Sequence, residues 1–271
     1  MISINTNYGG LFASKAASES QRTLDTAMER LSSGMRINYA KDDAAGQAIS
    51  TRLTAEVQGL EMASRNAADA QSMIDTAEGA LQETHTLLLR IRELSVQAAN
   101  GVHQNSDLTA LDAEAGAMIS EINRIDANTK WGGTELFNDA AKVFHVGVNN
   151  NASDKISVTM GDMSHTSLFS GSVDLSTQTK AQTTIGVVDI AIGRVSAERG
   201  KLGAVSNRLS STMANLDQVA VNLSASKGRI QDTDFAQETG NLAKNQILQQ
   251  AATAMLAQAN ASKQTVLALV R

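Results

Sequence analysis

The hydrophobic positions in the first half of the chain follow a coiled-coil repeat. Apolar or small residues recur at alternating steps of four and three, which puts one stripe of a helix against a partner helix. The pattern predicts a helix over about residues 43–99, about 85 Å long at 1.5 Å per residue, which implies a rod. Asn100 and Gly101 are expected to cap it. The repeat runs Ile49, Leu53, Glu56, Leu60, Ala63, Ala67, Ala70, Ile74, Ala77, Leu81, Thr84, Leu88, Ile91, Ser95 and Ala98.

A second repeat in the C-terminal half matches the first. It predicts a second long helix, antiparallel to the first, and a shorter helix lies between them over about residues 106–127, with Ser106 as its N-cap. The expected fold is therefore mainly α, a long antiparallel coiled-coil helical bundle. The seam of the second long helix is Val188, Val195, Leu202, Leu209, Leu216, Leu223 and Ile230, with Ile192, Met213 and Ala220 between them.

The middle of the chain changes period. Residues 142–148 (KVFHVGV) and 155–160 (KISVTM) alternate apolar and polar side chains, and a polar stretch rich in Asn links them. This pattern predicts a β-hairpin. We expect the hairpin region to cover about residues 134–176, with residues 161–180 forming a loop rich in Ser and Thr.

Both ends of the chain carry narrow helical stripes that are poor in large side chains. Such helices bury little apolar area against the entropy of ordering, so we expect them to fold only against copies of themselves. Residues 1–42 with 228–271 are predicted to form one terminal helical domain, and residues 43–227 a second, with a connector near residues 31–49. The stripes are Leu24, Met28, Leu31 and Met35, and Leu248, Ala252, Met255, Ala259 and Val266.

Composition removes most chemistry. The chain has 3% aromatic residues, no Cys and a net charge of −5, which excludes disulfides and thiolate metal sites and disfavours nucleic acid as a partner. No apolar run is long enough to cross a membrane, and the start does not read as a Sec signal peptide. The four histidines share no ligand spacing, and phosphate-binding and hydrolase motifs are absent. We expect no enzyme activity, cofactor or metal.

Four long blocks carry a family resemblance. They are LSSGMRINYAKDDAAGQAISTR (31–52), RNAADAQSMIDTAEGAL to LRIRELSVQAANG (65–101), ISEINRIDANTKWGGTELF (119–137) and LGAVSNRLSSTMANL with RIQDTDFAQETGNLAKNQILQQAATAMLAQAN (within 202–260). Over nearly its whole length the chain resembles bacterial flagellins. The resemblance implies a structural subunit that leaves by type III export and polymerises into the extracellular flagellar filament for motility. It also implies an inner tube of terminal helices, an outer bundle, and no outer variable domains here.

The resemblance also implies roles for residues. The connector matches the family's spoke between the two tubes. Residues 89–101 match a segment that a vertebrate innate immune receptor reads in some flagellins, although Leu89 departs from the expected Gln; axial subunit packing is the alternative role. The spoke residues are Arg36, Asn38, Asp42, Asp43 and Arg52; the inner-tube residues are Leu24, Met28, Leu31, Leu248, Ala252, Met255, Ala259 and Val266; the receptor residues are Arg90, Leu94 and Glu114.

The partners implied are the chain itself, sister flagellins, an export chaperone, the filament cap and hook-junction proteins. Two alternatives remain open at this point. A hook–filament junction protein shares the terminal helices but forms a short collar, and an intracellular coiled-coil adaptor shares the long repeats. The complete DDAAGQAISTR and ILQQAATAMLAQAN stretches favour a flagellin. Ser and Thr residues within 164–179 are candidates for glycosylation.

Overall fold

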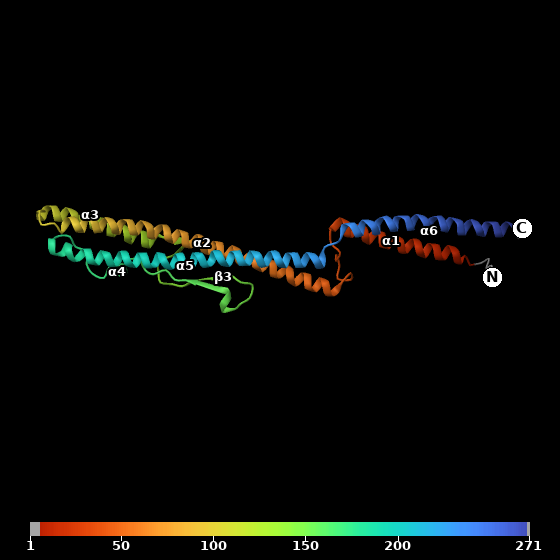
Figure 1. The fold of residues 1–271 in the computed structure, drawn as a ribbon, viewed down its shortest axis with the longest axis horizontal. Coiled ribbons are helices and arrows are strands. Elements are labelled where there is room, and N and C mark those ends of the chain that lie inside the picture. Colours follow the sequence, from red (N-terminus) through yellow and green to blue (C-terminus); the bar gives the residue numbers. More distant parts are fainter. Residues whose placement is uncertain (1–5, 270–271) are drawn as a thin grey trace. The chain divides into compact units, whose positions relative to one another are not determined.

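The computed structural model describes residues 6–269, with side chains described as far as residue 264. The chain divides into two compact units, one from residues 1–55 and 222–271 (unit 1) and one from residues 56–221 (unit 2). The elements are α1 (Tyr8–Ser33), α2 (Ala44–Ala98), α3 (Asn105–Asn128), β1 (Lys130–Trp131), β2 (Thr134–Glu135), β3 (Lys142–His145), the 3-10 turn η1 (Ala152–Asp154), β4 (Lys155–Val158), α4 (His165–Leu168), α5 (Gln178–Gln231) and α6 (Phe235–Leu269), as labelled in Figure 1.

Helix α2 confirms the long helix predicted from the first repeat. Nothing interrupts it, because the chain has no proline and α2 is rich in residues of high helix propensity. From Leu53 onward every predicted position is buried except Glu56, which is half-buried. Ile49 is the exception at the start of the repeat and is 41% exposed.

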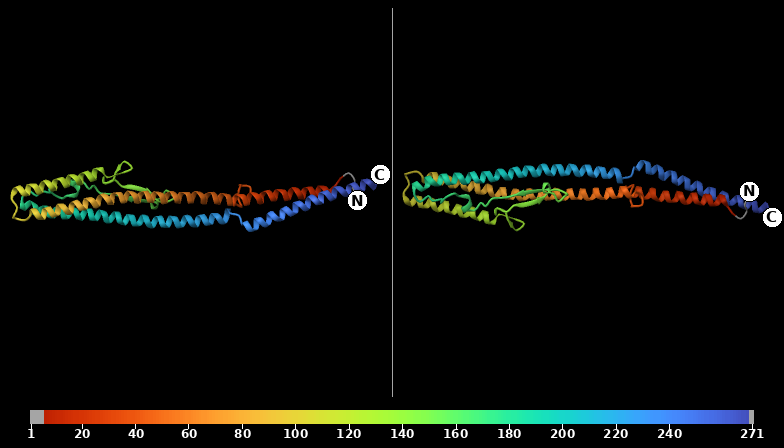
Figure 2. Two further views of the ribbon diagram at one scale, coloured as in Figure 1. Left: turned by 90° about the horizontal axis from the view of Figure 1, so that it is seen from above. Right: turned by 90° about the horizontal axis from the view of Figure 1, so that it is seen from below.

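Helices α2 and α5 run antiparallel in unit 2, and both views of Figure 2 show them side by side there. Their side-chain bonds prove the direction, because the partners on α5 fall in number as those on α2 rise. The bonds join Gln71 to Ser206 (2.9 Å), Glu78 to Arg199 (2.7 Å) and Arg92 to Asp189 (2.6 Å).

The seam of α5 follows the heptad prediction with one shift. Leu202 and Leu209 are buried together with the other predicted heptad positions as far as Leu216, whereas Leu223 and Ile230 are half-buried. Between the heptad positions, Ala191 is buried while the predicted Ile192 is only half-buried, because the seam steps by three and then by four at this point. On α2, the fully buried residues of the corresponding seam include Ala67, Ala70, Ala77, Leu81, Leu88 and Ile91.

The turn after α2 differs from the sequence-based expectation. Among the described residues the glycines with positive φ are Gly34, Gly132 and Gly133, so Gly101 does not form a left-handed cap. Instead the Gln178 side-chain amide donates to the Ala99 carbonyl at 3.0 Å, which satisfies one of the last acceptors of α2.

The start of α3 also lies earlier than predicted. The N-cap is Gln104, not Ser106. Asp107 Oδ2 accepts the backbone N–H of Gln104 at 3.1 Å, so the carboxylate three residues into the helix reaches back to its start.

The predicted β-hairpin is confirmed. Strands β3 and β4 pair antiparallel with Phe144 opposite Ile156, although they end before the predicted limits at Val148 and Met160. A Cβ at Gly59 of α2 would lie 2.9 Å from Val148 Cγ1, so glycine there permits the loop after β3 to lie against the helix. A second short pair, β1 with β2, precedes the hairpin.

Residues 161–177 return the chain from the hairpin to α5, mostly without regular structure; we call them the return segment. The prediction of a loop here missed the short helix α4. Side chains of α3 and α5 accept hydrogen bonds from backbone N–H groups of the return segment. These bonds satisfy donors that have no partner in a helix or a sheet. The bonds run from Gly161 to Glu198 (3.1 Å), Met163 to Asp126 (3.1 Å), His165 to Asn123 (2.8 Å) and Leu175 to Asp112 (2.7 Å).

Candidate functional site

The connector between α1 and α2 begins at Gly34, a position whose backbone conformation suits glycine better than any other residue. Gly34 has φ 72° and ends α1 in the left-handed conformation, with its N–H donating to the Arg30 carbonyl at 2.9 Å. The chain then turns out of helical geometry until Ala44, where α2 begins. Gly34 therefore ends α1 and opens the connector.

The connector pairs with the link between α5 and α6, both within unit 1. The Arg36 N–H donates to the Gln231 carbonyl at 2.7 Å, and the Thr233 N–H donates to the Gly34 carbonyl at 3.0 Å. Met35 and Asp232 form an antiparallel bridge between these bonds. Two distant pieces of the chain are thus joined through their main chains.

Arg36 adds a side-chain contact to this junction. Its Nη2 donates to the Ile230 carbonyl at 2.8 Å and lies 3.9 Å from Asp43 Oδ2. The guanidinium therefore binds one of the last carbonyls of α5, where a positive charge is favourable. The Asn38 side chain donates to the Met35 carbonyl at 3.2 Å and fixes the same turn.

Asp42 and Asp43 both accept hydrogen bonds from backbone N–H groups of the connector and of the start of α2. Asp42 Oδ2 accepts the N–H groups of Asn38 and Tyr39 at 3.2 and 3.0 Å. Asp43 Oδ1 accepts the Gly46 N–H at 2.8 Å, as a capping residue does at a helix start. The paired carboxylates thus shape the connector, and Arg52 lies exposed further along α2.

Sequence reasoning missed two residues of the connector. Ile37 is 1% exposed and is the apolar anchor of the turn. A Cβ at Gly46 would lie 2.8 Å from Ile37 Cδ1 and 2.4 Å from Asp43 Oδ2, so the start of α2 has no room for a side chain there. A lone isoleucine among polar residues and a glycine at a helix start were the available signals.

Helices α1 and α6 pack antiparallel in unit 1 (Figure 1). Asn7 Nδ2 donates to Asn260 Oδ1 at 3.2 Å near one end, and Arg30 Nη1 lies 3.9 Å from Glu238 Oε1 near the other. The buried apolar side chains between the two helices are few, and all except Leu24 are alanines: Ala13, Leu24, Ala27 and Ala252. These helices are formed in the single chain, so the expectation that they fold only against copies stays a prediction about the monomer in solution.

The residues predicted for the inner tube divide by exposure. Leu24 and Ala252 are buried between α1 and α6, and Leu31 and Ala259 are half-buried. Met28, Leu248 and Met255 are exposed. Val266 belongs to α6, but its side chain lies outside the described residues.

An apolar hollow of about 310 Å³ lies between α1 and α6, and we call it the assembly groove. Phe12 on its rim is 77% exposed and Met255 is 64% exposed. Tyr8, Leu11 and Ile247, which sequence reasoning missed, are exposed on the same two helices. Exposed apolar side chains gathered on one pair of helices are typical of interaction surfaces. The groove is lined by Gly9, Phe12, Ala13, Ala16, Ser20, Leu248, Ala251, Ala252 and Met255.

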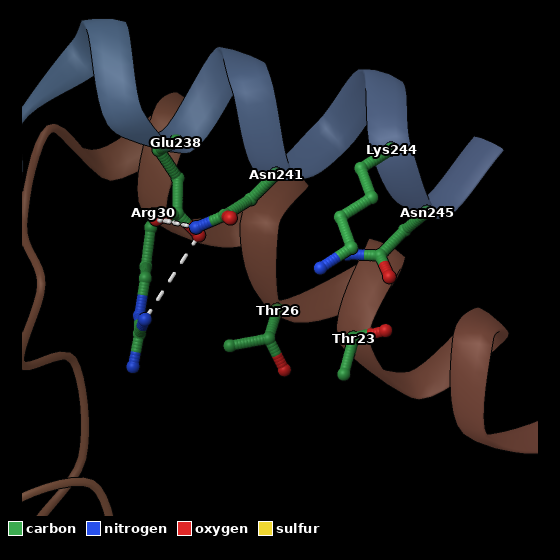
Figure 3. A pocket seen from close by; sticks show the side chains of 7 residues that line it. All are labelled: Thr23, Thr26, Arg30, Glu238, Asn241, Lys244 and Asn245. Carbon is green, nitrogen blue, oxygen red and sulfur yellow. Dashed lines mark hydrogen bonds and ion pairs between the residues drawn. The ribbon is translucent and has the colours of Figure 1, made fainter. Parts of the chain in front are cut away.

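A polar pocket of about 350 Å³ lies between the same helices (Figure 3). Glu238 is buried in the first turn of α6, where its charge is favourable, and accepts from Asn241 Nδ2 at 3.3 Å. Arg30 Nε is buried and has no hydrogen-bond partner among the described residues. The hydroxyl of Thr26 donates to the backbone of α1. The pocket therefore holds the ion pair of Arg30 and Glu238, whose Nη1 and Oε1 atoms lie 3.9 Å apart.

The predicted receptor residues lie on α2 and α3 in unit 2. Arg90 Nη2 pairs with Glu114 Oε1 at 3.1 Å and Arg90 Nη1 with Glu93 Oε2 at 3.0 Å, and these hydrogen bonds raise the pKa of Arg90. Leu94 is different, because it is 1% exposed and packs with Ala98 in the core. Leu94 therefore belongs to the core and not to the exposed surface that carries Arg90 and Glu114.

In the described part of the chain, no three His, Asp or Glu side chains gather closely enough to hold a metal ion. None of the described helices is long and apolar enough to cross a lipid bilayer.

Comparison with known proteins gives the family. The chain matches the bacterial flagellin N-terminal helical region over residues 4–142 and the bacterial flagellin C-terminal helical region over residues 185–270. It is 44% identical to a flagellin of Halalkalibacterium halodurans over 90% of this chain and 91% of that one. It is 41% identical to a flagellin of Bacillus subtilis over 99% of both chains.

A solved structure agrees with these relatives. The crystal structure of Bacillus cereus flagellin matches with a TM-score of 0.50 and 29% identity, over 60% of this chain and 94% of that chain. The alternative of a hook–filament junction protein is not favoured, because the family models and the relatives described above are flagellins. With two helical regions matched at its two ends, this chain belongs to the bacterial flagellin family.

Proposed function

We propose that the assembly groove is the surface through which one subunit of the flagellar filament joins the next. The protein is a structural subunit of that extracellular filament, as its family membership states. The occupant of the groove is a second copy of the chain. The single observation that carries this proposal is the exposure of Phe12, Leu248 and Met255 on a helix pair that buries mostly alanine between its members.

The exposed apolar side chains of the α1–α6 pair can stabilise a contact between subunits. Each large apolar side chain that moves from water into a contact contributes about 1.5–3 kcal/mol. The α1–α6 pair leaves several such side chains in water, and a filament offers the same contact at every subunit. Repetition of one modest contact is the usual basis of a polymer built from identical subunits.

Seeded polymerisation tests this proposal. Purified monomer is added to filament fragments, and elongation is followed by electron microscopy and sedimentation. We expect Phe12→Ser to raise the monomer concentration needed for elongation about tenfold, because roughly 1.4 kcal/mol of contact is lost per subunit. Val102→Ser is the matched control, since Val102 is also a highly exposed apolar residue but lies in unit 2. Equal elongation by both variants would refute the groove as the contact.

We also propose that the connector is a link of fixed shape at the boundary of a terminal domain. The residues that fix its shape are Arg36, Asn38, Asp42 and Asp43. We place that domain at residues 1–42 with 228–271 and the bundle domain at residues 43–227, with Arg52 near the link and the hairpin region at about 134–176.

In the bundle domain, Arg90 and Glu114 are the exposed pair that an innate immune receptor would bind. A receptor-reporter assay of Arg90→Ala, with Arg124→Ala as control, tests this recognition.

Further partners are proposed from family membership alone. They are an export chaperone, the filament cap, hook-junction proteins and sister flagellins. Pull-down of the monomer from flagellated cells, followed by mass spectrometry, tests the first three of these. Immunolabelling of single filaments with antibodies to each flagellin tests co-assembly.

A further inference from the structure

The methionine side chains that the structure describes differ widely in exposure. The sequence has ten methionines and no cysteine, so methionine thioethers are the only oxidisable sulfur. Peroxides oxidise such thioethers where the side chain is accessible. Buried methionines include Met73, Met160 and Met163, and exposed ones include Met28 (55%), Met62 (49%) and Met255 (64%).

Met255 differs from the other exposed methionines in its surroundings. It lines the assembly groove together with Phe12, Leu248 and Ala252, all apolar. Met62 lies in unit 2, and Met28 lies on α1 without lining the groove. Oxidation at Met255 alone would therefore put a polar atom into the groove.

We propose that oxidation of Met255 by hydrogen peroxide switches the free subunit out of assembly. The sulfur attacks one peroxide oxygen, the O–O bond breaks, and that oxygen stays on sulfur as the sulfoxide. The other oxygen leaves as hydroxide and takes the remaining proton to form water. Sulfur loses two electrons and the peroxide gains them, so the step needs no further reactant.

The effect on assembly follows from hydration. In the free subunit the sulfoxide oxygen lies in water and costs little. When a second copy covers the groove, that oxygen loses its water among side chains that are apolar except for the Ser20 hydroxyl. The monomer concentration needed for elongation should rise about tenfold or more. The contact also shields sulfur, so subunits already in a filament keep their thioether.

This inference rests on the proposed function, because Met255 matters only if a second copy covers the groove. A partition experiment on the wild-type chain tests it. Monomer is oxidised with hydrogen peroxide until about half of the exposed methionines are sulfoxides, and limiting seeds are then elongated with it. Pellet and supernatant are digested, and sulfoxide is quantified at each methionine by mass spectrometry.

We expect Met255 sulfoxide to be enriched about tenfold in the supernatant relative to the pellet. Met62 is the matched control and should partition equally, because its exposure is similar and it lies outside the groove. Equal partition of Met255 sulfoxide would overturn the inference. Enrichment of Met28 sulfoxide in place of Met255 would overturn it as well.

Two further measurements separate this inference from the proposed function. Untreated monomer that fails to elongate seeds refutes the function itself, whereas normal elongation with unselective partition refutes only the switch. Met255→Leu keeps the apolar volume and should elongate equally before and after peroxide, while Met62→Leu should stay sensitive. If Met255→Leu does not assemble, the partition of the wild-type chain still gives the answer.

Discussion

Leu88 and Leu89 are neighbours in α2 and test the heptad seam directly. Leu88 is fully buried in the core of unit 2, whereas Leu89 is 43% exposed. Replacement of either residue by alanine leaves helix propensity almost unchanged, because alanine and leucine are both strong helix formers. Any difference between the two variants therefore reports burial.

The expected magnitude comes from core truncation. Leu→Ala at a fully buried site costs about 2–5 kcal/mol, and we expect about 3 kcal/mol for Leu88→Ala. For a chain of this size each kcal/mol lowers Tm by about 2–4 °C, so Tm should fall by about 6–12 °C. Leu89→Ala should change the stability by less than about 0.5 kcal/mol, as surface substitutions do.

The assay is thermal unfolding of the monomer, followed by circular dichroism at the helix minimum. Urea unfolding with an unchanged slope would show that the loss is in stability and not in compactness. Equal shifts for the two variants would refute the assigned seam. A shift of Leu88→Ala below about 1 °C would refute the burial on which the magnitude rests.

Three other predictions are open to simple measurement. Gly46→Ala should lower Tm and Gly79→Ala should raise it slightly, because a Cβ meets Asp43 at the first position and open space at the second. Hydrogen bonds from Lys180 and then Ser176 lower the pKa of Asp174 to about 2, so Asp174→Asn should lower Tm at pH 7, and the difference should vanish as pH falls from about 4 to 2. Brief trypsin digestion of the monomer should trim both ends before residues 56–221, and even cleavage throughout would count against ends that fold only in the polymer.

The long helices were predictable because their repeat is long. A position such as Leu81 or Leu202 belongs to a series of many heptads, so a single atypical residue does not obscure the pattern. Short-range signals were weaker. Ser106 looked like an N-cap, but Gln104 and Asp107 make the cap, because several polar residues stand together at that helix start.

Other features depend on contacts that the local sequence does not encode. The return segment is held by Asp112, Asp126 and Glu198, which lie far from it along the chain, so its path could not be derived from its own residues. Leu94 appeared to belong to an exposed motif. The sequence of α2 alone does not show that α3 packs against this part of the helix and buries Leu94. The assembly groove required knowing that Phe12 and Met255 lie on adjacent helices.

The paired links of unit 1 have a mechanical consequence. A single covalent strand between two helical segments can turn about its φ and ψ dihedrals, although its peptide bonds stay planar. Here the segment that leads into α2 is hydrogen-bonded to the segment that follows α5, through the backbone N–H groups of Arg36 and Thr233. Two segments joined in this way cannot rotate independently of each other without breaking these two hydrogen bonds. Torsion applied to α1 and α6 within unit 1 is therefore opposed by these two hydrogen bonds as well as by the covalent chain.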